Sequence, residues 1–331
     1  MEPSACLPIK PASSPSRKRP KRARRSRSQT RYSPKRILCI KLANSFLFRY
    51  LPDKWAVRLV YHNIFGRPLN LKNPKTFNEK LQWLKLYNHN PLYTKLVDKF
   101  EVKEWVAQRI GQEYVIPTYG VWSTFDEIDF SALPDQFVLK TTHSGGSSGV
   151  IICKDKKKFD FADAKKKLAE SHKTDTYAVS REWPYKDVPH RILAEMFIEP
   201  DPEINDLPDY KFFCFDGEIK ALFVATERQT EGEEVKFDFY DDDFNHLPFR
   251  QGHDNACVLP KKPCNFEELK WLAKQLSSGF PHVRVDLYSV RGKVFFGEMT
   301  FFHFGGMMPF EPEEWDYVFG EWIKLPNSHN K

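Results

Sequence analysis

Antiparallel hairpins dominate the pattern of apolar and polar residues along this chain, and repeated strand–helix–strand units are absent. Asp216-Gly217 lies between two short apolar runs and is a strong signal for a tight hairpin turn. A second pair of β-rich runs flanks Arg291-Gly292, which also predicts a hairpin. Strands are expected at residues 191–198, 210–215 and 218–225. Hairpins flanked by helices predict an α+β layer fold.

Helical patterns fill much of the remaining sequence. Thr76 with Glu79 forms a capping box for a helix that contains LQWLKLY. Asn265 with Glu268 is expected to cap another helix that runs through Leu276. Further helices are expected at residues 98–110, 160–172 and 313–323. A chain of 331 residues with this content should form one large domain or two medium ones.

Residues 37–66, ILCIKLANSFLFRYLPDKWAVRLVYHNIFG, mix apolar and basic residues at helical spacing. The pattern predicts two short helices broken at Pro52. Such helices usually dock on the core of their own protein. A basic amphipathic pair can also lie on the cytoplasmic face of a membrane, so both placements stay open.

Charge is divided unevenly along the chain. Residues 1–36 hold twelve Lys and Arg residues and one acid, a net +11, and the whole chain carries +7, which leaves −4 for the remainder. With no apolar periodicity, this tail is expected to be disordered. It could serve nuclear import or nucleic-acid binding, attract an anionic membrane, or be a solvated extension without a role. A nucleic-acid-binding protein is the weakest of the overall functions, because the body of the chain is acidic.

Membrane insertion and secretion are not expected. No run approaches the roughly 18 apolar residues of a membrane span, and the charged N-terminal region leads into no apolar core with a cleavage site. The six cysteines show no CxxC spacing. Reduced thiols in a cytoplasmic protein are therefore expected, and that compartment also contains ATP.

The first candidate for chemistry is FVLKTTHSGGSSGV, residues 137–150. A short strand ends on Lys140, and a loop of Gly, Ser and Thr follows. Small residues let the backbone close around an anion, with successive N–H groups pointing at it. The lysine adds a point charge for phosphate. The pattern is neither a Walker A motif nor a dinucleotide-binding fingerprint, and a plain Ser/Gly-rich hairpin turn is the alternative.

The second candidate is the hairpin around Arg291-Gly292. Asp286 is the only acid in its first run and Glu298 the only acid in its second. Carboxylates in apolar strands are costly to bury unless they are paired or bind a metal, and hard oxygen ligands that bridge to phosphate suit Mg²⁺. Thr300 follows Glu298 by two residues and shares its strand face. Exposure of both acids to solvent on a two-sided sheet is the alternative.

A joint metal site in this hairpin carries a geometric condition. With a two-residue turn and regular pairing, Asp286 lies opposite Gly297, and Glu298 points to the other face. The two carboxylates share a face only if the turn has an odd number of residues or the ladder contains a bulge. A metal site here therefore requires such an irregularity.

Together these residues resemble the ATP-grasp superfamily, through the lysine-ended strand with its loop, the acidic segment ILAEMFIE and the acidic hairpin. The amino-acid sequence of residues 70–326 is similar to that of the TupA-like ATP-grasp family, which is named for teichuronopeptide biosynthesis. The phrases that carry the resemblance are NLKNPKTFNEKLQWLKLY, DKFEVKEWV, LPDQFVLK, SREWPYK, LPDYKFFCFDGEIK, FPHVRVDLY and GEMTFF.

The resemblance implies an ATP-grasp fold, in which two α+β subdomains clasp ATP. The implied organisation is a basic tail at 1–36, an N-terminal helical region at 37–112, a lid and nucleotide subdomain at 113–200, and a C-terminal subdomain with the metal site at 201–331.

The resemblance also implies roles for single residues. Lys99 and Lys140 would hold the ATP phosphates under a flexible lid, Glu195 and the backbone that follows it would meet adenine, and Glu199 is a candidate for the ribose. The residues implied to bind ATP are Lys99, Lys140, His143, Ser144, Gly145, Gly146, Ser147, Ser148, Glu195, Met196, Ile198 and Glu199.

For catalysis, the resemblance implies that Lys211 approaches the transferred phosphoryl group. Arg284 would stabilise the acyl phosphate or the tetrahedral state through charge-assisted hydrogen bonds. Asp286, Glu298 and Thr300 would form the Mg²⁺ site.

The chain departs from the family pattern at two positions. Thr300 stands where an Asn is usual, which weakens or alters a second metal site. His303 stands where a small residue or Pro is expected before Gly305-Gly306. A packed or solvated histidine is expected there, and a substrate ligand is the alternative.

Two activities follow from the resemblance. The first is an ATP-dependent ligase that joins a carboxylate and an amine, each a small molecule or linked to a polymer, in cell-surface polysaccharide or polymer synthesis. The second is a glycosyltransferase of polysaccharide biosynthesis, a label that members of the family often carry. The lysine loop and the paired carboxylates favour the first activity, because phosphoryl transfer relies on positioning and on neutralising charge.

Overall fold

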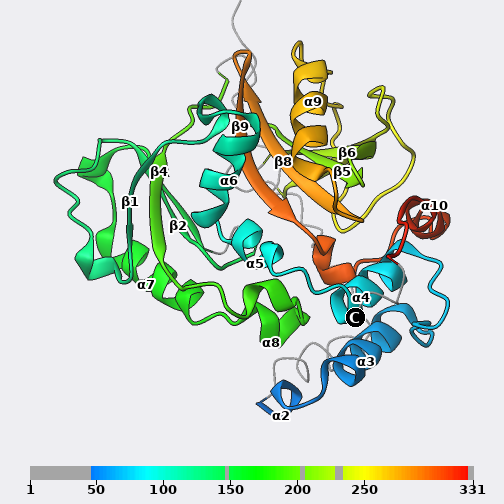
Figure 1. The fold of residues 1–331 in the computed structure, drawn as a ribbon. Coiled ribbons are helices and arrows are strands. Elements are labelled where there is room, and N and C mark those ends of the chain that lie inside the picture. The colour runs from blue at the N-terminus through cyan, green and yellow to red at the C-terminus, as the bar shows by residue number, and fades with distance from the viewer. Residues whose placement is uncertain (1–45, 146–148, 202–205, 228–233, 327–331) are drawn as a thin grey trace, which may run out of the picture.

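The computed structural model describes residues 46–145, 149–201, 206–227 and 234–326. Two separate antiparallel sheets with flanking helices make up the fold, so the predicted α+β class is confirmed (Figure 1). The predicted tail at residues 1–36 and the loop residues Gly146, Ser147 and Ser148 lie outside the described ranges.

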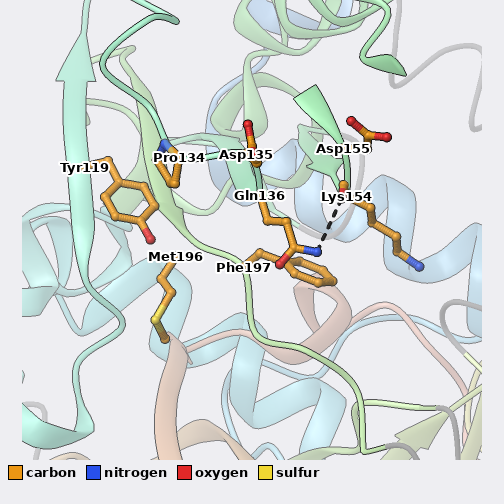
Figure 2. A pocket seen from close by; sticks show the side chains of 8 residues that line it. All are labelled: Tyr119, Pro134, Asp135, Gln136, Lys154, Asp155, Met196 and Phe197. Atoms are coloured by element: carbon orange, nitrogen blue, oxygen red, sulfur yellow. Dashed lines mark hydrogen bonds between the residues drawn. The ribbon is translucent and has the colours of Figure 1, made fainter. Parts of the chain in front are cut away.

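The first sheet has four strands in the order β1-β4-β2-β3. Their bounds are β1 Thr118–Trp122, β2 Phe137–Thr141, β3 Val150–Cys153 and β4 Ile192–Met196. Phe137 and Leu139 of β2 form a buried cluster with Leu168 of helix α7 (Phe161–His172), because alternate strand positions face the helix. Asp160 caps α7 by accepting a hydrogen bond from the backbone N–H of Asp163. A surface pocket opens at one end of this sheet (Figure 2).

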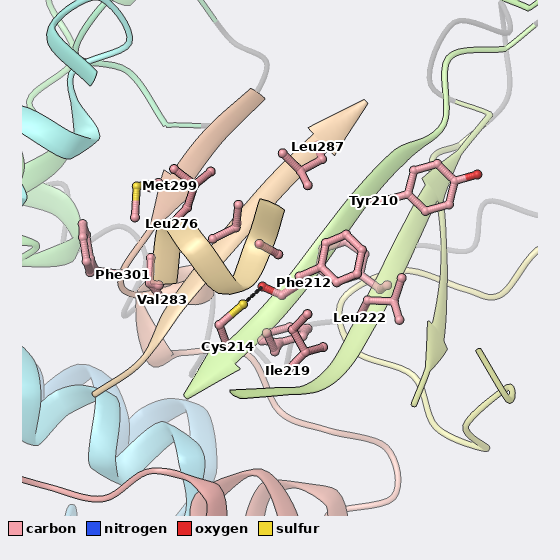
Figure 3. Close-up of a cluster of buried hydrophobic side chains, with 14 of the residues drawn as sticks. Tyr210, Phe212, Cys214, Ile219, Leu222, Leu276, Val283, Leu287, Met299 and Phe301 are labelled. Atoms are coloured by element: carbon pink, nitrogen blue, oxygen red, sulfur yellow. Dashed lines mark hydrogen bonds between the residues drawn. The ribbon is translucent and has the colours of Figure 1, made fainter. Parts of the chain in front are cut away.

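The second sheet has five strands in the order β7-β6-β5-β8-β9. Their bounds are β5 Asp209–Phe215, β6 Glu218–Thr226, β7 Lys236–Tyr240, β8 Val283–Val290 and β9 Lys293–Thr300. Helix α9 (Phe266–Ser277) covers one face, where Phe212 and Leu287 pack with Leu276 in the main core (Figure 3). Because side chains alternate along a strand, Lys211 and Asp286 point to the opposite face.

Helices surround both sheets. Their bounds are α2 Phe46–Arg49, α3 Asp53–Phe65, α4 Phe77–Tyr87, α5 Leu92–Val97, α6 Glu101–Ile110, α8 Thr176–Ser180 and α10 Glu314–Trp322. The break between α2 and α3 falls at Pro52, as predicted. The capping box of Thr76 and Glu79 is present at the start of α4. Helix α4 packs against α10 and against the short 3-10 turn η5 (His303–Gly306) that follows β9.

Both predicted hairpin turns are present. Asp216 and Gly217 have φ of 51° and 82°, and Arg291 and Gly292 have φ of 50° and 73°. Two positive φ values in succession give a turn whose twist matches that of the flanking strands.

Two helix predictions need correction. Helix α6 begins at Glu101 and not at residue 98, because the Asp98 carboxylate accepts hydrogen bonds from the backbone N–H groups of Phe100 and Glu101 at 2.8 and 3.2 Å. Asn265 precedes α9 but makes no side-chain cap. Its amide oxygen instead accepts a hydrogen bond from Ser289 at 2.8 Å.

Within the described ranges, no helix is long and apolar enough to cross a membrane.

Candidate functional site

A bulge between β8 and β9 aligns the two predicted metal carboxylates. Asp286 pairs with Glu298, while Leu287 pairs with Phe296, so Gly297 is the extra residue. The irregularity that the sequence required is therefore present. A side chain at Gly297 would lie 3.0 Å from the backbone oxygen of Asp286, which explains why glycine fits there.

Lys211, Asp286 and Glu298 form a row across the adjacent strands β5, β8 and β9. Nζ of Lys211 contacts the Asp286 carboxylate and lies 2.6 Å from Oδ2 of Asp209. Burial alone would lower the pKa of Lys211, but Asp209 and Asp286 raise it above its ordinary value. Lys211 thus stays positively charged at the β5 end of the row, beside Asp286.

Arg284 binds both carboxylates from the same face. Its Nε and NH2 donate to the two oxygens of Asp286 at 2.6 and 2.7 Å. NH2 also donates to Oε1 of Glu298 at 2.8 Å and to the hydroxyl of Thr300 at 3.0 Å. A planar guanidinium can bridge several acceptors in this way, whereas an ammonium cannot. Arg284 therefore lies beside all three predicted metal ligands.

His303 is buried, which agrees with the packed placement expected from the sequence, and it also contacts Arg284 of the site. Its Nδ1 accepts a hydrogen bond from NH1 of Arg284 at 2.7 Å, and its Nε2 donates to Oε1 of Gln251 at 3.2 Å. Burial and the charge of Arg284 hold the pKa of His303 well below its usual value of 6.5. Gln251 gave no signal in the sequence, because it lies in a loop far from the hairpin.

The first sheet contributes a second charged group. Nζ of Lys140 lies 2.6 Å from Oε2 of Glu195, and Nζ of Lys103 on α6 lies 3.1 Å from Oε1. Burial would raise the pKa of Glu195, but the two lysines lower it. Lys140 and Glu195 were both predicted to be site residues, and the structure brings them into contact. Lys103 was missed, because a lysine on an amphipathic helix has no distinguishing sequence context.

Lys99 links the two charged groups. Its side chain donates to the backbone oxygen of Ser144 at the start of the Gly/Ser loop. Burial would raise the pKa of Glu298, but the charges of Lys99, Arg284 and Lys211 lower it to about 2. Lys99, held by the first sheet's loop, thus acts on a carboxylate of the second sheet. Phosphates bound between the sheets would meet cations from both.

The described part of the Gly/Ser loop is anchored below its tip. Ser144 accepts a hydrogen bond from the Thr141 hydroxyl at 2.6 Å. The ring of His143 is buried and stacks on that of His190 with 3.6 Å between centroids, and its Nε2 lies 3.3 Å from the backbone oxygen of Ser171. The His143 side chain therefore anchors the loop from inside. Gly145 is exposed.

The end of β4 and the segment after it carry apolar side chains, which suit contact with the adenine base that the resemblance implies. Ile198 is buried in a small cluster that Met196 packs against from the side. The other buried members of this cluster are Ile116, Leu207 and Val290. Glu199, the predicted ribose ligand, is exposed and lies 3.7 Å from a guanidinium nitrogen of Arg291.

The surface pocket of Figure 2 does not coincide with these charges. It has a volume of about 540 Å³ and is lined by Tyr119, Pro134, Asp135, Gln136, Lys154, Asp155, Met196 and Phe197. It shares Met196 with the apolar end of β4 but contains none of the lysines or carboxylates of the site. The buried charges, and not this pocket, locate the candidate site.

The two carboxylates of the row, Asp286 and Glu298, fit a Mg²⁺ site that substrate phosphates would complete. Within the ranges described by the structure, no cluster of three or more His, Cys, Asp or Glu residues could hold a metal alone. Mg²⁺ usually takes one or two protein carboxylates and fills its remaining positions with phosphate and water. Asp286 and Glu298 would supply the two carboxylates, and the Thr300 hydroxyl lies 3.2 Å from Oε1 of Glu298.

Comparison with known proteins found one matching family model and several similar solved structures. The family model of TupA-like ATP-grasp proteins matches residues 79–324. No curated protein sequence matches the chain.

Several solved ligases are distantly similar in structure. A D-alanine–D-alanine ligase from Helicobacter pylori has 15% identity and a TM-score of 0.40, with 76% of this chain and 70% of that enzyme covered. An L-amino acid ligase from Bacillus licheniformis has 14% identity and a TM-score of 0.44, with 85% and 65% covered. A D-alanine–D-alanine ligase from Bacillus anthracis, in complex with ATP, has 13% identity and a TM-score of 0.34, with 62% and 53% covered.

Proposed function

Since the chain belongs to the TupA-like ATP-grasp family, we propose that it is an ATP- and Mg²⁺-dependent ligase that joins a carboxylate to an amine through an acyl phosphate. The observation that carries the proposal is the row of Lys211, Asp286 and Glu298, aligned by the bulge at Gly297 and bound by Arg284. A row of this kind neutralises and positions the oxygens of a transferring phosphoryl group.

Binding of ATP would use both charged groups. Lys99 and Lys140 would contact the phosphates, and the backbone after Glu195 with the apolar side chains of Met196 and Ile198 would border the base. Asp286 and Glu298 would hold Mg²⁺, which neutralises phosphate charge when it is bound. Lys140 suits this role because the Glu195 carboxylate, against the effect of burial, raises its pKa and keeps it charged.

The chemistry would take place in two steps. In the first, an oxygen of the substrate carboxylate attacks the terminal phosphorus of ATP, and ADP leaves with the bond electrons, with Lys211 beside the transferring group. In the second, a neutral amine attacks the acyl carbon, and phosphate leaves as the amide forms. Arg284 would donate hydrogen bonds to the oxyanion of the tetrahedral state. The amine gives up one proton in the second step.

The substrates would be small or polymer-linked carboxylates and amines of cell-surface polymer synthesis, in keeping with the family's name. The enzyme would work in the cytoplasm. The exposed side chains of Leu51, Trp55 and Leu59 on one side of α3 and of the preceding turn, with Lys54 nearby, support a further contact with the anionic inner face of a membrane.

A glycosyltransferase would need a sugar nucleotide in place of ATP. The acidic stretch at residues 241–243 does not favour that activity, because the Asp241 carboxylate is used locally. It accepts hydrogen bonds from the backbone N–H groups of Asp243 and Asn245 at 3.0 and 2.8 Å.

Nucleotide selectivity tests the proposal. Thermal stabilisation of the full chain by Mg·ATP should exceed stabilisation by UDP- or GDP-sugars. The double variant Asp286→Asn, Glu298→Gln should lose the Mg²⁺-dependent part of the shift. A larger shift with a sugar nucleotide would overturn the ligase assignment.

A further inference from the structure

Glu182 is a buried carboxylate that the proposed chemistry does not use. It lies between α8 and the 3-10 turn η4 (Trp183–Tyr185), and it is 8% exposed. The preceding residue, Arg181, has φ of 57° and turns away to bind Asp53 at 3.2 Å and the backbone oxygen of Phe48. The two neighbouring charges therefore face different surroundings and do not neutralise each other.

The charge of Lys85 acts on Glu182, but Glu182 forms no direct ion pair with a described residue. No Lys, Arg or His nitrogen of a described residue lies within 4.0 Å of its carboxylate, and the nearby Ser180 hydroxyl donates to the backbone oxygen of Thr176 at 2.8 Å. Burial is the main cause that raises the pKa of Glu182. Burying a carboxylate without a partner is costly, so this arrangement calls for an explanation.

Lys85 is the nearest candidate for a partner, but its donors are already used. Its Nζ donates to the amide oxygen of Gln82 at 3.0 Å and to the backbone oxygens of Ser180 and Gly305 at 2.9 and 2.7 Å. An ammonium group has three N–H donors, and these three acceptors take all of them. Lys85 thus fixes the backbone around Glu182 and leaves the carboxylate without a direct hydrogen bond from a cation.

Glu182 also borders the reaction site. A Cβ at Gly305 would lie 3.4 Å from Oε1 of Glu182, and Gly305 follows His303, the partner of Arg284, by two residues. The charges of Lys85, Arg284 and Glu298 all act on Glu182.

We propose that Glu182 forms the subsite that binds a primary ammonium group of the substrates, and that this group is the amine to be acylated once it has given one proton to the Glu182 carboxylate. The proposal rests on the proposed ligase function. The ligand would supply the cation in direct contact with Glu182 that the described residues do not provide. Arg284 on the other side would hold the acyl oxygen, so the amine and the acyl carbon would meet between the two residues.

A binding measurement tests the subsite without requiring turnover. The full chain with Mg·ADP is heated near neutral pH with n-propylamine hydrochloride or with potassium chloride at equal ionic strength. The amine should raise the melting temperature of the wild type and of Glu170→Gln, which removes an exposed carboxylate on α7. The shift should vanish in Glu182→Gln. Glu182→Asp, which keeps the charge on a shorter side chain, should give a smaller shift in melting temperature. This variant replaces Glu182→Gln in the test if Glu182→Gln does not fold.

A kinetic comparison identifies the source of the ammonium group. Hydroxylamine traps an acyl phosphate as a hydroxamate, and it is largely uncharged near neutral pH, so it does not need an ammonium subsite. With ATP and a mixture of D- and L-amino acids, Glu182→Gln should lower amide formation roughly tenfold or more relative to hydroxamate formation, as expected for one lost charge-assisted hydrogen bond. If both products fall together and KM rises for amino acids but not for their des-amino acids, the bound ammonium is that of the acyl donor.

Two results would overturn the inference. One is an equal amine-specific shift in the wild type and in Glu182→Gln, or no such shift in the wild type. The other is an equal loss of amide and hydroxamate with unchanged KM values, which would make Glu182 a structural residue. Failure of the wild type to form any hydroxamate would instead contradict the ligase function, and the binding measurement would still decide the role of Glu182.

Discussion

NH1 of Arg284 donates a hydrogen bond to Nδ1 of His303 at 2.7 Å. A guanidinium cannot accept, so Nδ1 of His303 must be unprotonated, and Nε2 carries the ring proton that is donated to Gln251. Gln251 in turn donates through its amide nitrogen to the backbone oxygen of Met308 at 3.1 Å, which fixes the orientation of its amide. A chain of three hydrogen bonds thus holds Arg284 in register with the two carboxylates.

Replacement of Arg284 by lysine tests the role of its planar guanidinium group. Arg284→Lys should keep Mg·ATP binding, because Lys99 and Lys140 remain, and should lower turnover roughly 10²-fold, as expected when one oxyanion donor is lost. Thermal shift with Mg·ATP and steady-state ADP release measure the two effects separately. Unchanged turnover would show that Arg284 is only a structural partner of the acids.

Replacement of His303 tests whether that residue positions Arg284. His303→Asn retains an acceptor near the position of Nδ1, whereas His303→Leu removes it. Asn should therefore restore a large part of the kcat that Leu loses, with little change in the KM for ATP in either variant. Equal kcat values in the two variants would argue against the positioning role.

Stability should depend on pH through buried neutral histidines. Burial lowers the pKa of His282 to about 3, against its ordinary value of 6.5, and that of His303 also falls well below 6.5. Below about pH 6.5 the unfolded chain binds protons that the folded protein does not, so the free energy of unfolding falls as the pH falls. Each histidine should contribute at most about 1.4 kcal/mol per pH unit.

Chemical denaturation between neutral and mildly acidic pH measures this dependence. His282→Asn keeps a donor for the Cys214 backbone oxygen, which His282 contacts at 3.0 Å, and should reduce the slope. His62→Gln, which removes an exposed histidine, is the control and should leave the slope as it is. A slope that His282→Asn does not change would contradict the assignment.

The basic tail is expected to bind surfaces and to take no part in the chemistry. Deletion of residues 1–36 should leave ATP binding and turnover intact, and should weaken salt-sensitive binding to anionic vesicles, since such binding depends on surface charge. Trp55→Glu in the full chain should weaken vesicle binding as well, because it places a negative charge on the exposed side of α3. Duplex DNA offered to the intact chain shows whether nucleic acid competes. Loss of turnover on deletion would place the tail at the active site.

Most of the candidate site followed from local sequence signals. Strand-end lysines such as Lys140, a Gly/Ser loop and single acids in apolar strands are visible because they break the local pattern. The hairpin at Arg291-Gly292 also gave the register, and the need for a bulge followed from strand geometry. The position of the bulge at Gly297 could not be predicted, because an extra residue anywhere between Asp286 and Glu298 satisfies the same condition.

Residues that act through long-range packing were not predictable. Lys103 reaches Glu195 only because α6 packs beside the first sheet, and Gln251 reaches His303 across 52 positions of sequence. Glu182 lies in the phrase SREWPYK, which helped to mark the family, but its lack of a direct ion pair depends on the three acceptors that Lys85 binds. The boundaries drawn at residues 36, 112 and 200 remain predictions.

Oxygen transfer from the carboxylate to phosphate tests the central claim most directly. The enzyme is incubated with Mg·ATP, an amine pool and a pool of carboxylates labelled with ¹⁸O in the carboxyl group, and the released phosphate is analysed by mass spectrometry. An acyl-phosphate ligase transfers one labelled oxygen to each phosphate, and does so only when both pools are present in addition to ATP. Phosphate without label, or product formation that requires a sugar nucleotide and leaves ATP intact, would contradict the account.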